Sequence, residues 1–205
     1  AIDPAHMWIQ EGFAVYSEAL YIEHKLGYNV MIDFLLKKRE GIKNNLPIVG
    51  PVNENYWAFG DSYNKGAWVL HTLRNAINDD DLWFSTLKKF AVDNAKSHVS
   101  TETFLNYIIN ATGKNYQLIF YQYFYDHRPP TFEYYQEGQM FYYRWSNVIS
   151  GFAMPVDIDL NGVENRLEVS EKLSSINISE YSVIHIRDWE SLIITKRNPD
   201  LKKLN

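Results

Sequence analysis

Along the first three fifths of the chain, hydrophobic residues recur every three or four positions, as in amphipathic helices. Short segments rich in Gly, Asn or Pro separate these stretches and are typical of helix ends. The pattern predicts helices at about residues 4–26, 28–44, 63–78, 80–96, 101–112 and 115–126.

The pattern changes near residue 128, where Pro129 and Pro130 cannot continue a helix. Hydrophobic and polar residues then alternate along 156–160 and 163–169, and the Asn-Gly pair between them is typical of a two-residue hairpin turn. Further strands are predicted at 140–145, 183–186 and 192–195. The sequence therefore predicts an α+β protein. Its parts are a helical domain over residues 1–128, a small antiparallel β-sandwich over 129–198 and a tail over 199–205.

The amino-acid composition excludes several classes of site and partner. With 205 residues, 46% of them hydrophobic, and a net charge of −5, the chain has the profile of one or two globular domains. It contains no cysteine, which excludes disulfides and thiolate catalysis and leaves His, Asp and Glu as possible metal ligands. The net charge is negative and Lys and Arg form no basic stripe, so nucleic acid is not an expected partner. No apolar run approaches the roughly 20 residues of a membrane span.

Two carboxylates occupy an unusual position on the first predicted helix. At 100° per residue, Glu11 and Glu18 lie within about 20° of each other, on the side that also carries Val15, Ala19 and Ile22. Burying an unpaired carboxylate costs several kcal/mol, so a positive group should meet these acids. Periodicity leaves two alternatives: a buried salt bridge to Lys or Arg, which is the commoner case, or a metal ligand with a second carboxylate behind it.

The residues around Glu11 add a family resemblance. Segment 8–18, Trp-Ile-Gln-Glu-Gly-Phe-Ala-Val-Tyr-Ser-Glu, resembles the W-x-x-E-G-F-A-x-Y-x-E motif of the aminopeptidase N family of zinc metallopeptidases, the gluzincins with a thermolysin-like catalytic domain. The resemblance implies that Glu11 is a zinc ligand. It also implies that Glu18 does not bind the zinc ion itself but contacts and orients another ligand or the substrate amine. Gly12 is expected to be small so that a neighbour can pack closely against this helix.

A second motif of the same family follows in the expected order. Ser62–Ala67 resembles the Y-x-K-G-A motif, whose tyrosine hydrogen-bonds the oxyanion of the tetrahedral intermediate, which implies a catalytic role for Tyr63. Asp61 or Ser62 is a candidate cap, so Tyr63 is expected in the first turn of a helix, where the helix dipole favours an anion. Without the neighbouring motif, Tyr63 would be read as one of many packing tyrosines.

The family takes its other two zinc ligands and its general base from an H-E-x-x-H motif, which does not occur in this sequence. His6 and His24 are poorly spaced to share a helix face with Glu11. We therefore expect the chain to be the C-terminal part of a longer enzyme that carries one zinc ion and cleaves a peptide substrate. An upstream part of the same polypeptide would supply two His ligands and a Glu base, and this part alone would be inactive.

The family's G-x-M-E-N motif is also absent from the sequence. The sequence therefore does not decide between aminopeptidase activity and another peptidase activity. The family's frequent export favours a periplasmic or extracellular location.

A hypothesis of another class remains open. The chain could be a noncatalytic module that keeps the packing motifs of a peptidase and binds protein or carbohydrate through its aromatic residues. The two hypotheses differ in what surrounds Glu11. The metallopeptidase requires Glu11 and Tyr63 to face the same cleft, whereas a Glu11 locked to Lys or Arg, with Tyr63 remote, would contradict it.

Overall fold

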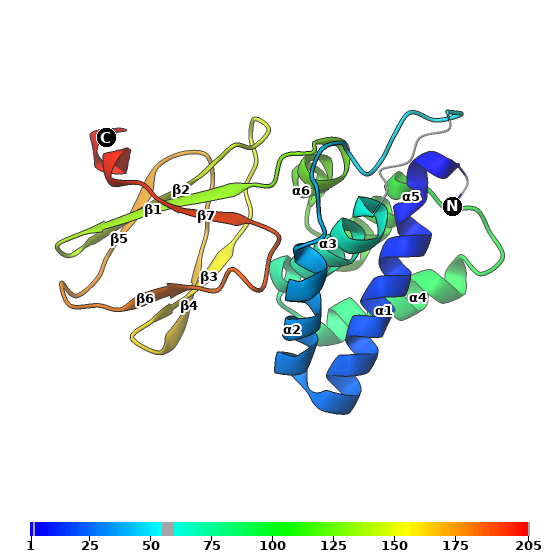
Figure 1. Ribbon diagram of the computed structural model, residues 1–205, viewed down its shortest axis with the longest axis horizontal. Coiled ribbons are helices and arrows are strands. Elements are labelled where there is room, and N and C mark those ends of the chain that lie inside the picture. The colour runs from blue at the N-terminus through cyan, green and yellow to red at the C-terminus, as the bar shows by residue number, and fades with distance from the viewer. Residues whose placement is uncertain (2, 55–59, 205) are drawn as a thin grey trace.

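A computed structural model describes residues 1, 3–54 and 60–204 of the chain. Figure 1 shows the helices gathered at one end and the strands at the other. The helical elements are η1 (Pro4–His6), α1 (Trp8–Leu26), α2 (Tyr28–Arg39), α3 (Asp61–Ile77), α4 (Asp80–Asp93), α5 (Thr101–Thr112), α6 (Gln117–Phe120), the π-helix η2 (Tyr121–Tyr125) and, after the strands, η3 (Pro199–Leu204).

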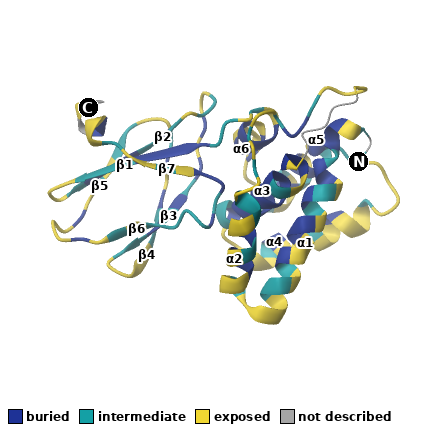
Figure 2. Ribbon diagram, viewed as in Figure 1, coloured by how far each residue is buried: buried dark blue, intermediate teal, exposed yellow. Residues whose placement is uncertain are grey.

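Helix α3 runs through the centre of the helical part and is buried along most of its length (Figure 2). Large aromatic side chains surround it, and their polar atoms find partners inside the core. Trp68 Nε1 donates to the carbonyl of Leu35 at 2.7 Å, and Trp8 Nε1 donates to Thr101 Oγ1 at 2.8 Å. These bonds fix α3 against α2, and α1 against the start of α5. No helix of the described residues is long and apolar enough to cross a membrane.

The strands form two sheets. They are β1 (Thr131–Glu137), β2 (Met140–Ser146), β3 (Val156–Leu160), β4 (Val163–Leu167), β5 (Ser174–Asn177), β6 (Ile184–Ile186) and β7 (Ile194–Arg197). One sheet has the order β5-β2-β1-β7 and the other the order β4-β3-β6. Buried aromatic residues fill the space beneath the first sheet, including the cross-strand pair Phe132 and Trp145, whose ring centroids lie 5.6 Å apart.

The predicted α+β class is confirmed, and so is the hairpin turn, where Asn161 and Gly162 have φ values of 55° and 80°. The sheets are mostly antiparallel, as expected, and one pair departs from this arrangement because β7 runs parallel to β1. Strands β1 and β5 were not predicted. In β1, Glu133 is buried and paired with Arg144 at 2.8 Å, so this strand lacks the alternation of hydrophobic and polar residues that marks a half-buried strand.

Buried hydrogen bonds join the helical and β parts. Tyr123 of η2 donates its hydroxyl to the carbonyl of Leu192 at 3.1 Å, and the Leu192 amide donates to Thr72 Oγ1 at 2.9 Å. Asn75 Nδ2 donates to the carbonyl of Glu190 at 2.8 Å. Because α3 contributes two of these partners, the helix that carries Tyr63 also supports the β part.

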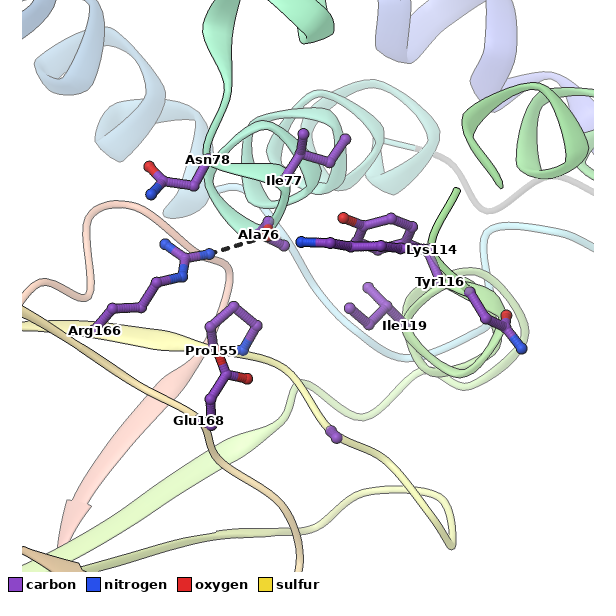
Figure 3. Close-up of a pocket in the computed structure, with 11 residues that line it drawn as sticks. Ala76, Ile77, Asn78, Lys114, Tyr116, Ile119, Pro155, Arg166 and Glu168 are labelled. Atoms are coloured by element: carbon purple, nitrogen blue, oxygen red, sulfur yellow. Dashed lines mark hydrogen bonds between the residues drawn. The ribbon is translucent and has the colours of Figure 1, made fainter. Parts of the chain in front are cut away.

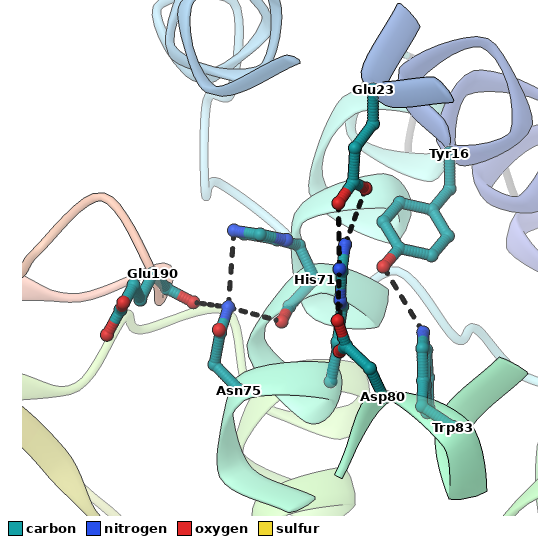
Figure 4. A network of polar contacts seen from close by, with 8 residues as sticks. Tyr16, Glu23, His71, Asn75, Asp80, Trp83 and Glu190 are labelled. Atoms are coloured by element: carbon teal, nitrogen blue, oxygen red, sulfur yellow. Dashed lines mark hydrogen bonds and ion pairs between the residues drawn. The ribbon is translucent and has the colours of Figure 1, made fainter. Parts of the chain in front are cut away.

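A buried ion network ties α1, α3 and α4 together (Figure 4). Arg74 of α3 is only 5% exposed and places its guanidinium 2.6 Å from Glu23 of α1 and 2.7 Å from Asp80 of α4. Hydrogen bonding to Arg74 lowers the pKa of Asp80 below its ordinary value. Asp79 caps α4 by accepting a hydrogen bond from the Leu82 amide at 2.9 Å, which agrees with a helix start at this acidic run.

Candidate active site

Helix α1 places its two acids differently from the expectation. Glu11 is half-buried at the edge of the buried face, and Glu18 is exposed. The buried face centres on Gly12, Val15 and Ala19, so it is rotated away from the two acids. The prediction that both carboxylates lie in the middle of the apolar face is therefore wrong. The physical reason is that α3 packs on the Gly12 side of α1.

The backbones of α1 and α3 touch where Gly12 meets Gly66. A Cβ atom built on Gly12 would lie 2.9 Å from Gly66 Cα, and one built on Gly66 would lie 2.9 Å from Gly12 Cα. Only glycine allows this approach, which gives Gly12 the packing role expected from the sequence. The contact brings Glu11, the neighbour of Gly12, beside the first turn of α3.

A Gly12→Ala substitution tests this crossing. We expect it to lower the free energy of unfolding by about 1–3 kcal/mol, because the new methyl group meets backbone atoms that cannot rotate away. The gain in helix propensity, about 1 kcal/mol, offsets only part of this cost. Gly60→Ala is the matched control, since Gly60 has a helical φ of −62° and no atom of the described residues lies within 4 Å of the point that its Cβ would occupy. Urea unfolding measures both, and equal stabilities would contradict the close crossing.

Tyr63 lies in the first turn of α3 and is 41% exposed. The Glu11 side chain lies close enough to the Tyr63 hydroxyl to raise the pKa of Tyr63, because a neighbouring carboxylate favours the protonated phenol. The structure thus brings together the two residues that the separate motifs singled out. Both side chains reach solvent, so a ligand has access to the pair.

The surroundings of Glu11 distinguish the two alternatives left by periodicity. Within residues 1, 3–54 and 60–204, no ion pair joins Glu11 or Glu18 to a Lys, Arg or His side chain. The same residues contain no group of three His, Asp or Glu side chains that could hold a metal ion. Among the described residues, Glu11 and Glu18 are therefore carboxylates without a cationic partner, and no complete metal site surrounds them.

Two polar residues anchor the first turn of α3, and neither anchor was predicted. The N-cap is Gly60 and no side chain caps the helix, so the expected capping role of Asp61 or Ser62 is wrong. Asp61 is buried and instead accepts hydrogen bonds from the amides of Lys43 and Asn44, each at 2.8 Å. Lys65 is fully buried and anchors the same turn on its other side.

The histidines of the chain do not join Glu11. His6 is buried, with Nδ1 2.9 Å from Thr101 Oγ1 and accepting from the Thr101 amide at 3.3 Å. His71 is fully buried in α3, its Nε2 lies 3.2 Å from Asn75 Nδ2, and burial lowers its pKa to about 3. Both are structural residues of the core.

A cavity of about 450 Å³ lies elsewhere, between the end of α3, the segment before α6 and the β part (Figure 3). Arg166 lines it, but its guanidinium is engaged by Asp157 at 2.7 Å and by the carbonyl of Ala76 at 3.0 Å. Neither Glu11 nor Tyr63 lines this cavity. It is a cleft at the junction, separate from the candidate active site.

Comparisons with known proteins give the family match and the fold likeness of the chain. Residues 4–123 match the Peptidase family M1 domain. The crystal structure of Legionella pneumophila aminopeptidase A in complex with aspartic acid superposes with a TM-score of 0.74 over 95% of this chain at 18% sequence identity. The aligned region is 24% of that protein, so the chain spans about a quarter of its length. A search of curated proteins found no match.

Proposed function

The chain belongs to peptidase family M1, and we propose that it is part of a longer zinc-dependent aminopeptidase. The observation that carries this proposal is the position of Tyr63 beside Glu11, a carboxylate without a cationic partner among the described residues. A half-buried acid beside a phenol, with no cation paired to it among the described residues, is suited to accept a cation from outside the chain. This part alone should be inactive, because it supplies one ligand and no general base.

The described residues supply part of the set of ligands that a zinc ion needs. Glu11 would be one of three protein ligands, and two His residues of an upstream segment would supply the others, which leaves one position for water. Bound zinc would lower the pKa of that water and polarise the peptide carbonyl. The close Gly12–Gly66 crossing holds Glu11 in place for this role, because α1 cannot slide along α3 without steric clash.

Tyr63 is proposed to stabilise the oxyanion. Its hydroxyl reaches the ligand carboxylate, so it is also placed to donate a hydrogen bond to a carbonyl oxygen bound beside that carboxylate. The raised pKa of Tyr63 keeps the phenol protonated and able to donate. Its place at the N-terminal end of α3 adds the favourable field of the helix dipole for developing negative charge.

Glu18 is proposed to contact a zinc ligand or the substrate rather than the zinc ion. It is two turns from Glu11 on the same side of α1, exposed, and unpaired with any cation of the described residues. An acid in this position can orient a His ligand from the upstream segment or attract the amino group of a peptide. Its exposure in this chain leaves it accessible to either partner.

Metal content tests the proposal directly. The longer protein that contains this chain should bind one zinc ion per molecule and hydrolyse aminoacyl substrates, lose activity to a chelator and regain it with added zinc. The 205-residue chain, measured in parallel, should show neither property. A longer protein with neither zinc nor activity would contradict the proposal and favour a noncatalytic module that binds protein or carbohydrate.

A further inference from the structure

Lys65 occupies a position that lysines rarely take. Its side chain is 0% exposed, two residues from Tyr63, and burying an ammonium group is costly unless its protons are satisfied. Burial lowers the pKa of Lys65 to about 8, while the nearby Asp61 and Asp126 oppose this shift. The ammonium group therefore remains mainly protonated at neutral pH.

The ammonium group is held by backbone oxygens. Lys65 Nζ donates to the carbonyl of Asp126 at 3.4 Å and to that of His127 at 3.3 Å, at the end of η2 and just before β1. This point lies just beyond the C-terminal end of η2, where the helix dipole favours a cation. Lys65 thus connects α3 to the linker, residues 126–130, which joins the helical and β parts.

This linker is itself firmly held. Asp126 pairs with Arg128 at 2.6 Å, and the fully buried Gln122 donates to the carbonyl of Arg128 at 2.7 Å. Gln122 also accepts a hydrogen bond from the Ile149 amide in the β part at 2.7 Å. The linker therefore gives Lys65 a fixed point of attachment.

The position of Lys65 on α3 explains what the attachment does. Residues two apart on a helix point about 200° away from each other, so Lys65 is directed inward while Tyr63 is directed outward to Glu11. The N-terminus of α3 has no side-chain cap, so the first turn depends on other anchors. We propose that Lys65 is a positioning residue, which holds the first turn of α3 against the linker and thereby fixes the Tyr63 hydroxyl at the Glu11 carboxylate. The inference rests on the proposed function, since the position of Tyr63 affects rate only in the active longer enzyme.

A double-mutant cycle in the longer enzyme tests this role, using Lys65→Met, Tyr63→Phe and the combined variant. Lys65→Met should lower kcat by about 10- to 100-fold, because displacing a catalytic group by about 1 Å has effects of this size. KM should change by less than about threefold and zinc content should stay at one per chain, because the oxyanion contact forms in the transition state. Tyr63→Phe should lower kcat by about 100-fold, and adding Lys65→Met to it should change kcat by less than about twofold.

Each outcome decides a different claim. Equal effects of Lys65→Met in both backgrounds, or no effect in either, would overturn the positioning role and leave the proposed function standing. An unchanged kcat in Tyr63→Phe would overturn the proposed oxyanion role of Tyr63 and with it the positioning role of Lys65, and would leave the metallopeptidase assignment standing. Lys89→Met, which removes an exposed lysine of α4, is the control and should leave kcat unchanged. If Lys65→Met does not fold, Lys65→Gln replaces it in the double-mutant cycle, because glutamine keeps a hydrogen-bond donor in the buried position. The same outcomes then support or overturn the positioning role.

Discussion

A Glu11→Gln variant of the longer enzyme is expected to lose its zinc and to fall in kcat/KM by at least about 1000-fold. The neutral amide is a much poorer ligand than the carboxylate, and a catalytic zinc site has only three protein ligands. Metal assistance contributes several kcal/mol to the transition state, and each 1.36 kcal/mol corresponds to a tenfold change in rate. The loss of the metal therefore predicts a loss of activity of this size.

The fold should be unaffected, which separates this result from unfolding. Glu11 lies at the edge of the buried face, and Gln has nearly the same size and keeps an oxygen that can accept a hydrogen bond. With both proteins in the metal-free form, so that bound zinc does not stabilise either, we expect the free energy of unfolding to change by less than about 0.5 kcal/mol. Metal analysis, steady-state kinetics and urea unfolding measure the three quantities. Glu40→Gln at the exposed end of α2 is the matched control, and a Glu11→Gln enzyme with full zinc and activity would exclude Glu11 as a ligand.

The sequence predicted the residues of the candidate site better than their surroundings. Two short motifs, separated by about fifty positions, identified Glu11 and Tyr63, and the structure joins their side chains. The helical periodicity misplaced Glu18, because counting apolar residue types does not show where the neighbouring helix lies. Gly12 counts as neutral in such a pattern, yet it is the centre of the contact with α3.

The supports of the site could not be predicted because they are backbone atoms distant in sequence. Asp61 is held by the amides of Lys43 and Asn44, and Lys65 by the carbonyls of Asp126 and His127. Backbone groups leave no signature in residue type. The one signal in the sequence was the lysine of the Y-x-K-G-A motif, placed where the helix pattern requires a buried residue. The parallel pairing of β7 with β1 could not be predicted for a related reason. It depends on the path of the long connection between the two strands, which the alternation of hydrophobic and polar residues does not show.

Replacing Arg74 with methionine is expected to lower the free energy of unfolding by about 3 kcal/mol. Arg74 is only 5% exposed and makes two hydrogen bonds to Glu23, at 2.6 and 2.8 Å, and two to Asp80, at 2.8 and 2.7 Å. Its guanidinium also lies 4.8 Å from the ring centroid of Phe84, a favourable cation–π distance. Methionine fills similar space but leaves the carboxylates without a cation. The expected loss lies at the lower end of the roughly 3–5 kcal/mol range for broken buried pairs, because Asp80 keeps access to water.

A second substitution distinguishes lost charge pairing from lost packing. Adding Glu23→Gln to Arg74→Met should recover about 1 kcal/mol, because the half-buried Glu23 no longer carries an unpaired charge. Lys89→Met, which breaks an exposed pair with Asp93 on α4, should change stability by less than about 0.5 kcal/mol. Urea unfolding of these variants beside the unsubstituted chain gives these values. An Arg74→Met protein as stable as Lys89→Met would mean that the network does not hold α1, α3 and α4 together. In that case the Gly12–Gly66 contact and the aromatic core would have to orient α1 against α3, and with them Glu11 against Tyr63.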